Sequence, residues 1–290
     1  SAPYTAIRTI HQLAKDEGHM YPQAANVLLE QVYVDDILSG ANTIEDGVAL
    51  EKQLISILRG ASFELKKWAS NDLRLLANIP KEHWHDQDLL QLKSSDTIKA
   101  LGMYWDPHSD EFRFNIKFEI PIENVTKRII LSTVARLFDP LGWLNPVIVS
   151  AKILLQQLWA CKIGWDVIIP DEIQVLWRAY ATELSKISEI RVPRWLNIKN
   201  YNQSVELHIF CDASKDAHAA VAYIRGLNIA NEYVVKLIQA KSKVNPIKPK
   251  LTIPRAELSG AVSAAKLANF IISNWNIQFR EVFLWTDSAI

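Results

Sequence analysis

The chain has 290 residues, with 32 Lys and Arg against 32 Asp and Glu, so its formal net charge is zero. A hydrophobic fraction of 49% and a charged fraction of 22% are typical of globular proteins and exclude disordered, collagen-like and low-complexity classes. The zero net charge argues against nucleic-acid binding, because binding to phosphates requires Lys and Arg.

The first 60 residues are expected to form two helices on either side of a hairpin. Apolar residues recur at helical spacing from Pro3 to about Gly18. The segment from Asn26 to Gly40 is interpreted as a hairpin that begins with the apolar residues Val27 to Leu29. A helix is predicted from Thr43 to Gly60, because Thr43 and Asp46 have the spacing of a capping box.

Short strands are predicted between residues 60 and 120. Phe63 to Leu65, followed by Trp68, is a strand candidate, and Asn78 to Ser95 is a polar connection. Two further strands, Ala100 to Trp105 and Glu111 to Phe118, flank a sequence with the composition of a turn. They predict a second hairpin.

The pattern becomes helical from Thr126 to about Leu184. It is interrupted by Asp139 to Gly142 and by Gly164 to Pro170, so about three helices are expected. Four tryptophans fall within this pattern and are expected to be mostly core residues, although indoles can also stack on bases: Trp143, Trp159, Trp165 and Trp177.

A polar linker from Pro193 to Ser204 precedes a strand-rich region. The predicted order is three strands, one helix and one strand: Val205 to Asp212, Ala219 to Arg225, Glu232 to Ala240, Pro254 to Ile272, and Glu281 to Asp287. The sequence therefore predicts an α+β fold in three parts: residues 1–119, 120–200 and 201–290.

Two adjacent carboxylates, Asp35 and Asp36, would lie at the tip of the first hairpin. Paired carboxylates repel each other unless a cation or water separates them, and magnesium sites for phosphoryl transfer use one or two of them. An exposed turn is the simpler alternative, because Asp favours turns.

A second set of carboxylates lies in the strand-rich region. Asp212 ends one predicted strand, Glu257 lies on the predicted helix, and Asp287 ends the last strand. Small residues follow Glu257 on one helix face, at Ala261, Ala264 and Ala268, and would let the helix approach the sheet. Each acid also has a separate structural explanation, as a turn residue, a helix-dipole partner or a cap.

Positive charge is concentrated immediately before Glu257. From Lys236 to Arg255 there are six cationic residues and no Asp or Glu. A basic loop beside an acidic metal site suits an RNA–DNA hybrid, whose backbone is bound without base readout, and a solvated lysine loop is the alternative. The residues expected to contact nucleic acid here are Lys241, Lys243, Lys248, Lys250 and Arg255.

Tyr33-Val34-Asp35-Asp36 resembles the Y-x-D-D box of reverse transcriptases. Phe63 to Trp68 resembles the strand that carries a lysine near the incoming triphosphate, and Leu137 to Gly142 with Gly164 to Asp166 resembles the Pao/BEL class of long-terminal-repeat retrotransposons. The resemblance implies that Asp35 and Asp36 bind the catalytic metals and that Lys66 or Lys67 approaches the triphosphate. It also implies a primer-positioning hairpin that comprises Leu101, Gly102, Met103, Tyr104 and Trp105.

Three later segments resemble the acidic motifs of a retroelement ribonuclease H: Phe210 to Ser214, Pro254 to Leu258, and Trp285 to Ser288. The resemblance implies that Asp212, Glu257 and Asp287 bind two Mg²⁺ or Mn²⁺ ions for cleavage of RNA in RNA–DNA hybrids. One metal-binding acid of each site would lie outside the chain, so we expect a fragment with little polymerase activity and impaired nuclease activity.

The expected partners are an RNA template, a DNA primer, RNA–DNA hybrids, deoxynucleoside triphosphates and flanking polyprotein domains. We expect an intracellular location, in the cytoplasm or a virus-like particle, because the chain has two cysteines and no signal-peptide pattern. We expect no membrane partner, because no apolar stretch is uninterrupted over the length of a membrane helix. The alternatives are a catalytically inactive nucleic-acid-binding remnant of a decayed element and a structural polyprotein segment.

Overall fold

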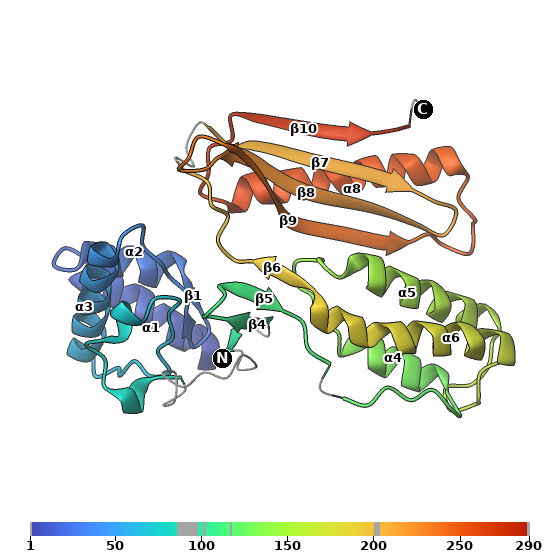
Figure 1. The fold of residues 1–290 in the computed structure, drawn as a ribbon, viewed down its shortest axis with the longest axis horizontal. Helices are drawn as coiled ribbons and strands as arrows, with labels where there is room; N and C mark the ends of the chain where they lie inside the picture. Colours follow the sequence, from blue (N-terminus) through green and yellow to red (C-terminus); the bar gives the residue numbers. More distant parts are fainter. Residues whose placement is uncertain (1, 86–97, 101–102, 117, 200–203, 289–290) are drawn as a thin grey trace. The chain divides into compact units, whose positions relative to one another are not determined.

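The computed structural model describes residues 2–85, 98–100, 103–116, 118–199 and 204–288. The chain forms two compact units, one of Ser1–Phe114 with Arg191–Arg194 and the other of Asn115–Ile190 with Trp195–Ile290 (Figure 1). Both contain helices and strands, so the fold class is α+β as expected. None of the helices in the described residues combines the length and apolarity needed to cross a bilayer.

The first unit begins with three helices: α1 (Ala2–Glu17), α2 (Pro22–Glu30) and α3 (Ile44–Gly60). Helices α1 and α3 are confirmed predictions, and the Thr43 hydroxyl caps α3 by accepting a hydrogen bond from the Asp46 amide at 3.1 Å. The strand predicted at Val27 to Leu29 is wrong. This segment is helical because Ala24, Val27 and Leu28 are buried together at helical spacing.

A two-stranded hairpin, β1 (Val32–Tyr33) and β2 (Asp36–Ile37), follows α2. Val34 and Asp35 form its turn, in which Val34 has a left-handed backbone with φ of 57°. The prediction that Asp35 and Asp36 lie at a hairpin tip is confirmed.

The strand predicted at Phe63 to Leu65 is wrong. Ser62 and Lys67, on either side of it, have φ values of 62° and 57°, which turn the backbone away from an extended path. Within residues 63–68, Trp68 alone forms a β-bridge, and its partner is Trp84. Two short 3₁₀ helices follow, η1 (Leu73–Leu76) and η2 (Lys81–His83). Residues 86–95 of the predicted connection lie outside the described residues.

A second sheet in the first unit has the antiparallel order β3-β4-β5-β6. Its strands are β3 (Ile98–Ala100), β4 (Met103–Asp106), β5 (Glu111–Arg113) and β6 (Arg191–Pro193). The predicted hairpin is confirmed at β4 and β5, but its second strand ends at Arg113 instead of Phe118. The start of the predicted linker, at Pro193, belongs to β6 because residues 191–193 pair with β5.

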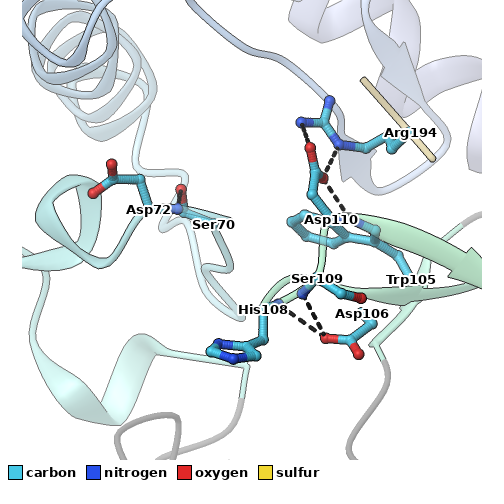
Figure 2. A network of polar contacts seen from close by, with 8 residues as sticks. All are labelled: Ser70, Asp72, Trp105, Asp106, His108, Ser109, Asp110 and Arg194. Carbon is cyan, nitrogen blue, oxygen red and sulfur yellow. Dashed lines mark hydrogen bonds and ion pairs between the residues drawn. The ribbon is translucent and has the colours of Figure 1, made fainter. Parts of the chain in front are cut away.

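Polar contacts hold β6 and the β4–β5 hairpin together (Figure 2). The Arg194 guanidinium donates to both carboxylate oxygens of Asp110, at 2.6 and 2.9 Å, and the Trp105 indole donates to Asp110 at 3.0 Å. The buried Asp106 carboxylate accepts from the amides of His108 and Ser109. A chain segment far away in the sequence is thereby fixed to the hairpin.

The second unit contains the three predicted helices, α4 (Lys127–Ala135), α5 (Asn145–Ala160) and α6 (Asp171–Leu184), with a 3₁₀ helix η4 (Ser185–Glu189). Trp177 is fully buried, as expected. The expectation is wrong for Trp159 and Trp165, which are 58% and 41% exposed. These two lie at the end of α5 and in the loop after it.

The second unit also contains a four-stranded mixed sheet in the order β10-β7-β8-β9. Its strands are β7 (Glu206–Ala213), β8 (Ala217–Leu227), β9 (Tyr233–Val244) and β10 (Glu281–Thr286), and β10 pairs with β7 in parallel. Helix α8 (Ile253–Asn274) lies across one face of β7 and β8 (Figure 1). The predicted order of three strands, helix and strand is confirmed.

The helical part packs against the outer strand of this sheet. The Ala240 amide in β9 donates to the Leu141 carbonyl at 2.8 Å, and the Ser242 hydroxyl donates to the Asn145 side chain at 3.1 Å. Helix α5 runs beside β9 (Figure 1). The three helices and the sheet therefore belong to one unit.

Candidate metal centre

Three carboxylates from three different elements converge at one end of the mixed sheet. Asp212 lies near the end of β7, Glu257 in the second turn of α8, and Asp287 directly after β10. One carboxylate oxygen from each lies within 4.8 Å of the others. Asp212 and Asp287 are exposed and Glu257 is half-buried, so solvent reaches the cluster.

Strand pairing and a close helix approach bring these residues together. Parallel pairing aligns Thr286 with Cys211, so the residues that follow, Asp287 and Asp212, are neighbours. Helix α8 approaches closely because Gly260 lies against β7, where an added Cβ would be only 3.3 Å from the Asp212 carbonyl oxygen.

The small face predicted on α8 is confirmed in part. Ala264 and Ala268 are buried and Ala261 is half-buried. Gly260, which lies against the strand, was not predicted from the sequence. Its position three residues after Glu257, on the same helix face, could have identified it.

The electrostatic environment favours a cation. The pKa of Glu257 is raised, first by desolvation and then by the negative charges of Asp212 and Asp287. The pKa of the neighbouring Cys211 thiol is also raised, mainly by burial and further by the same carboxylates. Because a divalent cation between the oxygens would remove this repulsion, the donor set fits Mg²⁺ or Mn²⁺.

The backbone after Asp212 is held by hydrogen bonds. The Ala213 amide donates to the Asp212 carboxylate at 2.7 Å, and the buried Asn245 side chain donates to the Ser214 carbonyl at 2.8 Å. The Asn245 amide oxygen lies 2.8 Å from Nδ1 of His218. Asn245 was not predicted from the sequence, because its partners come from a different strand and turn.

The basic stretch is only partly a loop. Lys241 and Lys243 lie on β9, and Lys248 and Lys250 lie between β9 and α8. Arg255 lies in the first turn of α8, and all five side chains are exposed. The loop interpretation is wrong for Lys241 and Lys243, because they pair with Ala220 and His218 of β8.

The first unit contains the other predicted site residues. Asp35 and Asp36 are exposed, and in the part of the chain that the structure describes no third Asp, Glu, His or Cys joins them in a ligand group. Lys66 forms an exposed ion pair with Glu64 at 3.0 Å. Of the predicted primer-positioning residues, Met103, Tyr104 and Trp105 lie on β4, whereas Leu101 and Gly102 lie outside the described residues.

Comparison with known families decides the relationship of this chain. Residues 126–288 match the family described as the Pao retrotransposon-like RNaseH-like domain. The chain belongs to this family. The match to the Pao retrotransposon-like RNaseH-like domain includes α4, α5 and α6, the mixed sheet, and all three converging carboxylates.

Two solved structures of a foamy viral protein are also similar. One is the protease-reverse transcriptase dRH in complex with ds DNA, with 16% identity, a TM-score of 0.49, and coverage of 93% of this chain and 41% of that chain. The other is the protease-reverse transcriptase in complex with dsDNA, with 16% identity, a TM-score of 0.22, and coverage of 96% and 50%. This chain thus spans half or less of either foamy viral chain, and similarity at these TM-scores supports no conclusion about its activity. No curated protein matches the chain.

Proposed function

We propose that the second unit cleaves the RNA strand of RNA–DNA hybrids, with divalent cations held by Asp212, Glu257 and Asp287. The observation that carries the proposal is the convergence of their carboxylate oxygens within 4.8 Å. Membership of an RNaseH-like family supports the same reaction class.

The residues of the chain have separate tasks in this reaction. Bound Mg²⁺ or Mn²⁺ supplies activation of water and neutralises the charge that develops on the phosphodiester. Asp212, Glu257 and Asp287 hold the cations, and the Ala213 amide keeps the Asp212 carboxylate in place. The exposed Lys241, Lys243, Lys248, Lys250 and Arg255 attract the backbone of the hybrid without reading its sequence.

We infer for the first unit the role of a reverse transcriptase palm segment, which would act on an RNA template, a DNA primer and deoxynucleoside triphosphates. The hairpin that presents Asp35 and Asp36 in a Y-V-D-D sequence supports this proposal. In this proposal Lys66 or Lys67 contacts the triphosphate, and the β4 residues Met103 to Trp105 position the primer. The proposal also divides the chain into domains at 1–119, 120–200 and 201–290, joined to flanking polyprotein domains. The proposed location is the cytoplasm or a virus-like particle.

The test is cleavage of a labelled RNA–DNA hybrid by the 290-residue chain in Mg²⁺ or Mn²⁺. We expect cleavage to be lost in Asp212→Asn and in Glu257→Gln. Asp35→Asn is the matched control, because it removes a carboxylate from the other unit and should leave cleavage unchanged. Equal cleavage by the wild type and Asp212→Asn would refute the assignment.

The same experiment distinguishes a second function. A catalytically inactive nucleic-acid-binding protein would bind the hybrid in a salt-dependent way and leave its RNA intact in both metals. A structural segment of a polyprotein would not bind the hybrid at all.

A further inference from the structure

Two exposed tryptophans form a surface at the end of α5. Trp159 is 58% exposed and Trp165 is 41% exposed. Their ring centroids are 6.0 Å apart, and the ring planes are nearly perpendicular, at 82°. We call this pair the tryptophan surface.

Cationic side chains adjoin the tryptophan surface. The Lys127 ammonium lies 5.9 Å from the Trp159 ring centroid and 5.6 Å from that of Trp165, and the Arg128 guanidinium lies 5.9 Å from Trp165. Lys162 is exposed in the turn that follows α5. Positive charge therefore surrounds apolar rings.

Lys127 is unusual because its charge is buried. It is 7% exposed, and its ammonium donates to the Ile163 carbonyl at 2.8 Å. No carboxylate in the described part of the chain forms an ion pair with it, whereas the Arg128 guanidinium is paired with Asp166 at 2.7 Å. The Ile163 carbonyl and the two indole rings therefore hold the Lys127 charge beneath the tryptophan surface.

Local folding accounts for part of this arrangement. The Arg128 amide donates to the Trp165 carbonyl at 3.2 Å, and the Arg128–Asp166 pair fixes the loop to the first turn of α4. These contacts explain why Trp165 and Asp166 lie where they do. They leave the indole of Trp159 facing solvent, where burial would have been the more favourable state for so large an apolar group.

We propose that the tryptophan surface binds single-stranded nucleic acid. Bases stack on the indoles of Trp159 and Trp165, and the phosphates lie near the exposed side chains of Arg128 and Lys162. Aromatic rings combined with cations are the usual means of binding single strands without sequence preference. The proposal concerns residues other than the three carboxylates and does not depend on the proposed nuclease activity.

The test is fluorescence anisotropy of a labelled 12-nucleotide oligodeoxythymidylate, titrated with the full chain in low salt and EDTA. EDTA removes any contribution from cations at the carboxylates. Trp159→Ala is expected to weaken binding roughly tenfold, within the range measured for loss of one stacked base. Trp195→Ala is the matched control, because Trp195 is 53% exposed in the same unit and lies outside the surface.

Two further variants separate stacking from charge. Trp159→Phe keeps an aromatic face and is expected to retain most of the affinity, and Lys162→Gln is expected to reduce the slope of log affinity against log salt by about 0.7. Absence of oligonucleotide binding by the wild type would overturn the proposal, as would equal affinities of Trp159→Ala and Trp195→Ala. So would dimerisation that Trp159→Ala abolishes without changing oligonucleotide affinity, because the surface would then contact a second copy of the chain.

Discussion

The indole Nε1 of Trp143 donates a 3.0 Å hydrogen bond to the Ile238 carbonyl oxygen in β9. Together with the bond from Ala240 to Leu141, it places the segment before α5 along the outer edge of the mixed sheet. An uncovered edge strand can pair with other chains. The helical part thus covers this sheet edge.

Gly142→Ala tests this junction. Gly142 has φ of +77°, and an added Cβ would lie 1.9 Å from the Ala240 carbonyl oxygen. We expect a loss of about 3 kcal/mol in the unfolding free energy of the second unit, from left-handed backbone strain and the clash. Hydrogen exchange of the β9 amides measures this loss of unfolding free energy. Gly164→Ala is the control, because its Cβ would meet only the end of the Val167 side chain, at 3.2 Å.

The carboxylate cluster should destabilise the metal-free protein. Asp212→Asn removes a negative charge that raises the pKa of Glu257. In EDTA the variant should therefore melt at a higher temperature than the wild type. Added Mg²⁺ should raise the melting temperature of the wild type and have little effect on the variant. A variant that melts lower in EDTA would contradict repulsion among these groups.

The pH dependence of stability should contain a contribution from Glu206. The Arg225 side chain donates to its carboxylate at 2.6 Å and, with a smaller effect of His208, lowers the pKa of Glu206. A lowered carboxyl pKa stabilises the fold above the unfolded-state pKa near 4.5, and this stability is lost as the pH falls through the lower folded-state pKa.

Glu206→Gln should therefore cost about 1.5 kcal/mol at pH 7, a modest value because Arg225 is 35% exposed. Urea unfolding of the wild type and of Glu206→Gln at pH 7 and at pH 3 measures this difference in unfolding free energy. The difference from the wild type should be smaller at pH 3 than at pH 7, and an equal difference at both pH values would assign the effect to packing.

The β4–β5 hairpin should depend on Asp106. This buried carboxylate forms an ion pair with Arg113 and accepts hydrogen bonds from the amides of His108 and Ser109. Asp106→Ala should destabilise the first unit by about 3 kcal/mol. His108→Ala keeps the backbone amide and removes an exposed side chain, so its urea midpoint should match the wild type.

Local signals in the sequence were sufficient for several elements. The Thr43 cap predicts α3, and the alternation from Val205 to Asp212 predicts β7. Three elements were wrong or missed for physical reasons. A three-residue apolar run such as Val27 to Leu29 suits a strand or a helix, the backbone at Ser62 and Lys67 has no sequence signal, and Arg191–Pro193 becomes a strand only by pairing with β5.

The carboxylates of the site could be predicted from the sequence, whereas the contacts that hold the neighbouring backbone could not. Asp212 and Asp287 lie at the ends of predicted strands and Glu257 lies near the start of a predicted helix, so their convergence was expected. Asn245 holds the turn after Asp212 through contacts between distant residues, and helical periodicity gave no indication that Trp159 is exposed. Such features depend on tertiary contacts, which periodicity does not encode.

The parallel pairing of β10 with β7 has a consequence for biosynthesis. Asp287 joins Asp212 and Glu257 only through this pairing, which links the last described strand to one before β8, β9 and α8. A chain still emerging from the ribosome, or one whose last strand has detached, holds two carboxylates of the three. The proposed metal site is therefore complete only after Asp287 has been synthesised and β10 has paired with β7.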